Sequence, residues 1–134
     1  MVGGVAVAAA DATDWEQNYR VPDLTLTTPD RLGINRTSHI AGAPTVVGEV
    51  FAPGDETYER LPFYAALGVP EVWVFDRDTR AVELRVLTAG GYELTAPDAD
   101  GWHASPATGV AFRPTGAGTV WARVRGAAEE LPRG

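Results

Sequence analysis

The stretch that most constrains the fold is residues 45–76, in which two apolar segments flank a helical one. "TVVGEVF", residues 45–51, is rich in β-branched and aromatic side chains and predicts a strand that is buried on both faces. "EVWVFD", residues 71–76, predicts another strong strand, and residues 56–67 between them predict a helix that ends at Gly68. This succession favours an α/β domain with a mixed sheet and its main helix on one face.

For the start of this helix, the sequence predicts a cap, a kink and an ion pair. Asp55, in the "APGD" break after the first strand, can cap the helix, because its side-chain oxygen can accept a free backbone N–H. Pro62 removes one backbone hydrogen bond and is expected to kink the helix. Glu56 and Arg60 stand four residues apart, a spacing that is common for exposed ion pairs on one helix face.

The rest of the chain is predicted to be mainly β-structure around this unit. A strand is expected over residues 20–28, with Asp23 near its start, and an antiparallel meander over residues 72–95. Weaker strand patterns occur at 109–114 and 119–124. Irregular segments complete a single domain of 134 residues: an N-terminal part over 1–18, loops over 29–44 and 96–109, and a frayed tail over 126–134.

The composition excludes several kinds of chemistry. The chain has no cysteine, so any metal must be bound by carboxylates or by the two histidines, His39 and His103, which both fall in predicted loops. All eleven basic side chains are arginines, so no mechanism that requires a lysine can operate. The net charge of −7 argues against broad, non-specific binding of nucleic acid.

The sequence also bears on where the protein acts. No apolar run approaches the roughly 20 residues that are needed to span a bilayer. The first residues are small and apolar but lack the basic start of a signal peptide. A cytoplasmic protein without a membrane partner is therefore expected.

Three charged residues fit one chemical hypothesis. Asp23 begins one strand, Glu49 lies in the next, and Arg60 is on the helix directly after it. If these strands are neighbours, the two carboxylates would lie within reach of one Mg²⁺ ion, and the arginine would add a positive charge beside a phosphate. A structural interpretation stays open at this level, with Asp23 as the cap of a turn and Glu49 paired with Arg60 in a partly buried ion pair.

The order of several short motifs resembles the Uma-type restriction endonuclease family, which belongs to the PD-(D/E)XK nuclease superfamily. The motifs are "VPDLTL" at 21–26, the block "GAPTVVGEVFAPGDETYERLPFYAALGVPEVWVFD" at 42–76, and the "GGYEL" turn at 90–94. The resemblance covers about residues 19–114. It implies a restriction-endonuclease-like α/β fold, in which a mixed central sheet is flanked by helices.

The same resemblance assigns roles to individual residues. Asp23 matches the aspartate of the PD element and Glu49 the acidic residue of the (D/E)XK element, so both are expected to bind Mg²⁺ or Mn²⁺, together with the backbone carbonyl of Val50. The lysine position of that element is Phe51 here, and in this family the lysine has moved to the following helix, where Arg60 stands. The implied activity is metal-dependent hydrolysis of DNA phosphodiester bonds, with Asp23, Glu49 and Arg60 as the catalytic residues.

Departures from the family pattern lower the expected activity more than they lower the expectation of the fold. Arg60 replaces the helix lysine, Ala52 stands where serine is usual, and Thr45 stands where an acidic residue is frequent. The part before Arg20 is also shorter than in most members. An impaired endonuclease with DNA as its substrate is therefore expected. The alternative is an inactive nuclease-like domain that serves as a binding or interaction module, and a homodimer is compatible with both.

Overall fold

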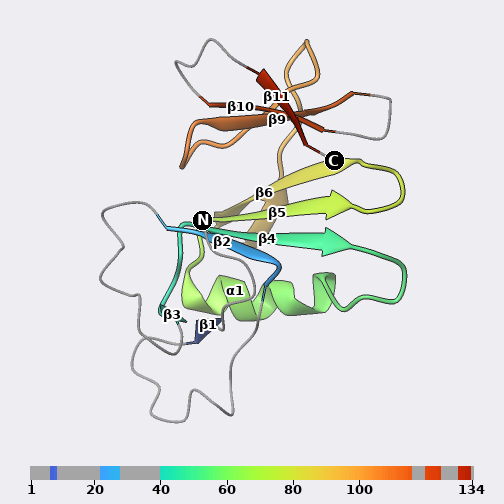
Figure 1. Cartoon of the computed structure of the whole chain (residues 1–134). Coiled ribbons are helices and arrows are strands. Elements are labelled where there is room, and N and C mark those ends of the chain that lie inside the picture. Colours follow the sequence, from blue (N-terminus) through green and yellow to red (C-terminus); the bar gives the residue numbers. More distant parts are fainter. Residues whose placement is uncertain (1–6, 9–21, 28–39, 116–119, 125–129, 134) are drawn as a thin grey trace.

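A five-stranded mixed sheet lies at the centre of the computed structural model, which describes residues 7–8, 22–27, 40–115, 120–124 and 130–133 (Figure 1). Its strands, in spatial order, are β2 (Leu24–Leu26), β4 (Val46–Phe51), β5 (Glu71–Asp76), β6 (Val82–Thr88) and β7 (Gly91–Leu94). β4 and β5 run parallel, and the other neighbouring pairs in this sheet are antiparallel. The predicted mixed sheet and meander are confirmed. Of the strand predicted over 20–28, the structure describes residues 22–27, and within them the strand is limited to the three residues of β2.

One helical segment connects the two parallel strands and covers one face of the sheet (Figure 1). It consists of a 3₁₀ turn, Tyr58–Arg60, and the helix α1, Leu61–Leu67, which follows without a break. Two parallel strands need such a crossover, because the chain must return to the starting edge before the second strand begins. Gly68 ends α1 in the left-handed conformation with φ 84°, as predicted.

The start of this helical segment differs from the prediction of a capped helix over 56–67. Asp55 does not cap it, because Asp55 Oδ2 accepts a hydrogen bond from Ala52 N (2.9 Å) and closes the turn after β4 instead. Pro62 does not interrupt a helix interior, because α1 begins at Leu61 and the proline occupies the first turn. A backbone N–H there has no partner within the helix, so proline causes no loss.

A second, antiparallel sheet packs on the opposite face of the central sheet (Figure 1). Its strands, in spatial order, are β11 (Glu130–Arg133), β10 (Val120–Val124), β9 (Val110–Pro114) and β8 (His103–Ala104). β9 and β10 match the two weaker strand patterns. Two predictions are corrected, because β8 pairs with β9 inside the segment predicted as a loop, and β11 pairs with β10 inside the segment predicted to fray.

The three layers enclose two apolar cores, one on each face of the central sheet. Neighbouring residues of a strand point to opposite faces, so β4 and β5 contribute to both cores. The first four residues of β4 are buried on both faces, as predicted for this strand, whereas Val50 is exposed. The core under α1 comprises Val47, Tyr64, Val69, Val72 and Val74. The core between the two sheets comprises Val46, Trp73, Val82, Leu84, Phe112 and Val120.

A buried carboxylate links the two sheets. Glu71 is only 1% exposed and accepts hydrogen bonds from Trp73 Nε1 (3.0 Å), from the hydroxyl of Ser105 and from Ala107 N (2.7 Å). Since burial of a carboxylate is unfavourable unless its oxygens are satisfied, these three donors explain how Glu71 can lie between the layers. They also fix the loop between β8 and β9 against the central sheet.

A short parallel pair lies apart from both sheets. β1 (Val7–Ala8) pairs with β3 (Ile40–Ala41), although both fall in segments predicted to be irregular. The remainder of the predictions for 1–18 and 29–39, including the loop position of His39, falls outside the described residues. No helix within the described ranges is long and apolar enough to cross a bilayer.

Candidate active site

The candidate site lies where the edge strand β2 stops short along β4. The pairing of the two strands extends as far as Leu24, which lies opposite Gly48, so Asp23 comes opposite Glu49. Gly48 permits this close pairing, because a Cβ at that position would lie 2.5 Å from Leu24 Cγ. Residues that lie opposite each other in an antiparallel pair point to the same face, which brings Asp23 to the side of Glu49.

Asp23 is tied to the backbone of β4. Its Oδ2 accepts a hydrogen bond of 2.7 Å from Val50 N, and the aspartate is exposed. In an extended strand the N–H and C=O of one residue point to the same side, so the Val50 carbonyl also faces the side on which Asp23 lies. The structure thus brings the Asp23 carboxylate and the Val50 carbonyl to the same edge of β4.

Glu49 lies beneath the helical segment, and 2% of its surface is exposed. Its Oε1 accepts a hydrogen bond from Tyr64 Oη at 2.9 Å, and its Oε2 lies 3.5 Å from Arg60 Nη1. Burial raises the pKa of Glu49 above its usual value of 4.5. The hydrogen bond from Tyr64 and the charge of Arg60 lower this pKa, and the charge of Asp23 raises it.

Arg60 is the residue at which the 3₁₀ turn passes into α1, and it remains 33% exposed. The sequence allows two ion-pair partners for Arg60, namely Glu49 and Glu56. Glu56 precedes the first helical residue and is exposed, so the four-residue helix spacing does not apply. Arg60 pairs with Glu49, and the structure therefore brings Asp23, Glu49, Val50 and Arg60 together.

Tyr64 is the residue of this site that sequence reasoning assigned only to the core. It is fully buried, and its hydroxyl is the nearest partner of Glu49. The sequence spacing indicates its place, because residues four apart on a helix, such as Arg60 and Tyr64, lie on the same face. Tyr64 follows Arg60 by one helical turn, and Arg60 is expected to face Glu49. The hydroxyl of Tyr64 can therefore reach the same carboxylate.

The described histidine does not join this site. His103 lies in β8 of the second sheet, opposite Phe112 of β9. Burial lowers its pKa, and Nδ1 has no hydrogen-bond partner among the described residues. In the part of the chain that the structure describes, no three His, Asp or Glu side chains converge to form a metal cluster. Among the described residues, the ligands available to a cation at the candidate site are the two carboxylates and the backbone.

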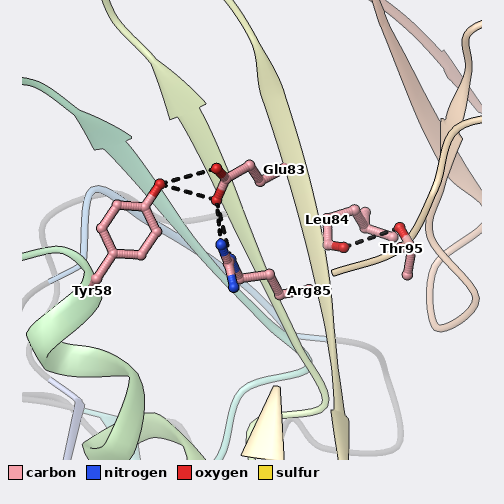
Figure 2. Close-up of polar contacts among 5 residues, drawn as sticks. All are labelled: Tyr58, Glu83, Leu84, Arg85 and Thr95. Atoms are coloured by element: carbon pink, nitrogen blue, oxygen red, sulfur yellow. Dashed lines mark hydrogen bonds and ion pairs between the residues drawn. The ribbon is translucent and has the colours of Figure 1, made fainter. Parts of the chain in front are cut away.

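A second polar cluster ties the 3₁₀ turn to β6 (Figure 2). The hydroxyl of Tyr58 donates to the Glu83 carboxylate, with distances of 3.0 and 3.1 Å to its two oxygens. Arg85 Nε and Nη2 donate to Glu83 Oε1 at 3.1 and 2.9 Å, and the Arg85 guanidinium lies 5.3 Å from the centre of the Tyr58 ring. Because the same turn ends in Arg60, this cluster helps to fix the position of the arginine above Glu49.

The fold is that of a known class of nuclease-like proteins. A solved structure described as a "putative nuclease belonging to DUF820" from Anabaena variabilis ATCC 29413 matches with a TM-score of 0.54 at 18% sequence identity. The match covers 78% of this chain and 58% of the other, so this chain spans less than two thirds of that protein. A likeness at this identity establishes the restriction-endonuclease-like fold alone, and it confirms the predicted fold class.

The family is established by a match over most of the sequence. The model of the Uma2 family, which is described as "Putative restriction endonuclease", matches residues 3–114. The chain belongs to this family, and the predicted resemblance is confirmed. No curated protein matches the chain.

Proposed function

We propose that this chain is a Mg²⁺-dependent endonuclease that hydrolyses DNA phosphodiester bonds at a reduced rate. The observation that carries the proposal is the junction of Asp23, Glu49 and the Val50 backbone where β2 ends along β4. Membership of a family described as restriction endonucleases supports the reaction class and the choice of DNA as substrate.

The donors at this junction fit a hard cation. Asp23 and Glu49 offer carboxylate oxygens. Within the described part of the chain, Asp23 accepts one hydrogen bond, at Oδ2, and Glu49 accepts one from Tyr64 at Oε1 and one from Arg60 at Oε2. The Val50 carbonyl adds a third oxygen on the side of Asp23. Mg²⁺ commonly binds one or two carboxylates and completes its coordination with water and substrate phosphate. Once bound, such an ion lowers the pKa of a coordinated water and offsets the charge that develops on the phosphate.

Arg60 explains why the rate is expected to be low. Its guanidinium stays positively charged near neutral pH, and its partial exposure leaves it accessible to a phosphate beside Glu49. It cannot donate or accept a proton in the reaction, and it is larger and flatter than the ammonium group of a lysine. Arg60 therefore keeps the charge at this position but does not place a compact cation beside the attacking water.

Cleavage of supercoiled plasmid DNA tests the proposal. The wild type should nick the plasmid slowly in Mg²⁺ or Mn²⁺ and not in EDTA. Asp23→Asn and Glu49→Gln should abolish nicking, because each removes one negative charge while keeping an oxygen that can accept the hydrogen bond made by the native side chain. Glu93→Gln, at an exposed position in β7, is the matched control and should cut like the wild type.

The outcome separates the proposal from its main competitor. Nicking that persists in EDTA, or that survives in Glu49→Gln, would exclude this site as its source. The competitor is a DNA-binding module without cleavage, which is favoured by the replacement of the expected lysine by Arg60. In that case, the protein should retard a DNA duplex in a gel and leave the plasmid intact at every metal concentration.

A further inference from the structure

The closest hydrogen-bond partner of Glu49 is an uncharged residue. Tyr64 Oη donates to Glu49 Oε1 at 2.9 Å, and the two side chains are 0% and 2% exposed. The ion pair between Arg60 and Glu49 Oε2 measures 3.5 Å, and Arg60 is one-third exposed. A partly exposed arginine retains many rotamers, whereas a buried tyrosine is fixed by its neighbours. The orientation of the Glu49 carboxylate is therefore set mainly by Tyr64.

We propose that Tyr64 is the positioning residue for Glu49 as a metal ligand. The inference rests on the proposed function, because it needs a cation at Glu49. As a neutral donor, the hydroxyl satisfies Oε1 and leaves the negative charge of the carboxylate available to a cation. Each carboxylate oxygen has two lone pairs, so neither the bond to Oε1 nor the ion pair at Oε2 uses the full acceptor capacity of Glu49. Outer donors of this kind typically contribute ten- to a hundredfold to metal affinity.

The fold explains why Tyr64 can perform this task. Its ring lies in the core under α1, together with Val47 of β4 and Val72 and Val74 of β5. Glu49 is two residues from Val47, so both point to the face that α1 covers. The hydroxyl is thus carried to the carboxylate by a packed helix and not by a loop. Tyr64 is buried away from solvent, so it would touch neither substrate nor metal, and its effect on the metal site would pass through Glu49.

Two tyrosine variants form a matched pair for the test. Tyr64→Phe removes the hydroxyl that contacts Glu49, and Tyr92→Phe removes one that donates to the Val69 carbonyl at 2.7 Å in the same layer. Mn²⁺ affinity is measured at pH 7.5 from the electron paramagnetic resonance signal of free Mn²⁺. Tyr64→Phe should raise the Mn²⁺ dissociation constant about tenfold or more, and Tyr92→Phe should change it less than twofold. A loss of packing alone would affect both variants alike.

The results separate this inference from the function on which it rests. If the wild type binds Mn²⁺ and Tyr64→Phe binds it as tightly as Tyr92→Phe does, the positioning role is overturned and the metal site stands. If the wild type does not bind Mn²⁺ at millimolar concentration, the proposed metal site itself is overturned.

A measurement on the wild-type sequence covers the case in which Tyr64→Phe does not fold. The protein is labelled with 3-fluorotyrosine, and the Tyr64 fluorine signal is assigned by removal of the other tyrosines, Tyr19, Tyr58 and Tyr92, one at a time. Saturating Mg²⁺ should shift the Tyr64 signal, because its partner Glu49 becomes a ligand, and the shift should disappear in Glu49→Gln. An unchanged Tyr64 signal at saturating Mg²⁺ would overturn the inference.

Discussion

Tyr64→Phe should destabilise the protein more than Arg60→Ala does. This is expected although only Arg60 carries a charge opposite to that of Glu49. Tyr64→Phe breaks a buried hydrogen bond of 2.9 Å to a charged acceptor, which is worth about 1.5–3 kcal/mol. Arg60→Ala breaks a 3.5 Å ion pair of a side chain that is one-third exposed, and such pairs contribute about 0.2–1 kcal/mol.

The comparison depends on which partner keeps the buried carboxylate satisfied. The loss of one member of a fully buried ion pair costs about 3–5 kcal/mol, because it leaves an uncompensated charge. That value does not apply to Arg60, since Tyr64 remains in place and solvent reaches the arginine. Glu49 therefore loses its main partner only in Tyr64→Phe.

Urea unfolding monitored by circular dichroism measures both free energies, in EDTA so that no cation contributes. The slope m should be the same in both variants, and only the midpoint should move. Tyr92→Phe provides the scale for a hydrogen bond to a neutral acceptor, about 0.5–1.5 kcal/mol. A free-energy loss in Arg60→Ala that equals or exceeds the loss in Tyr64→Phe would refute the reasoning and make Arg60 the principal partner of Glu49.

Three further variants test other parts of the structure. Arg60→Lys should raise Mg²⁺-dependent plasmid cleavage roughly a hundred- to a thousandfold with little change in thermal unfolding, and unchanged or slower cleavage would show that the arginine does not limit the rate. Glu71→Ala should lower the unfolding free energy in urea by at least about 3 kcal/mol, because two buried donors, Trp73 and Ser105, and the part-buried Ala107 N–H lose their acceptor. A loss below about 1 kcal/mol would contradict the link between the sheets. Gly48→Ala should lower the unfolding free energy by about 1–3 kcal/mol and weaken Mn²⁺ binding, because a Cβ would lie 2.5 Å from Leu24 and displace the strand that carries Asp23. Gly90→Ala is its control, since nothing lies within 4 Å of that Cβ, and equal effects of the two alanines would contradict the argument.

Local sequence patterns predicted the centre of the fold, because strand composition and helix-ending residues determine the structure there. β4 and β5 are strands rich in valine and aromatic residues whose first four residues are buried, and Gly68 ends α1 by its left-handed conformation. The start of the helical segment was misplaced because Asp55, a good cap by type, closes a turn with Ala52 instead. Propensity alone cannot distinguish these two uses of the same carboxylate.

The missed strands and contacts depend on residues far apart in the sequence. β8 is two residues long and exists because β9 lies beside it, so no periodicity marks it. The hydrogen bond between Ser105 and Glu71 spans 34 positions. The order of two strands and a helix groups Asp23, Glu49 and Arg60, and the family motif assigns their metal-binding and catalytic roles. The sequence pattern places Tyr64 only in the core, because its hydroxyl has a role only once α1 is packed over Glu49.

The burial of Glu49 should appear as a pH dependence of stability. Its pKa in the folded protein is raised above 4.5 by burial, so between 4.5 and the folded pKa the folded state binds more protons than the unfolded state. The stabilising contribution of this group is thus fully present below pH 4.5 and is lost as the pH rises through the folded pKa.

Glu49→Gln cannot titrate at this position and keeps an oxygen that accepts the Tyr64 hydrogen bond, so it tests this pH dependence. Relative to the wild type, the variant should therefore gain stability as the pH is raised from 4 to 7, measured by urea unfolding in EDTA. His103, whose folded pKa is lowered by burial, loses its contribution as the pH falls below 6.5, but it is present in both proteins and cancels in the difference. A difference between the two curves that does not change with pH would mean that Glu49 is not held in the buried environment from which the candidate site is built.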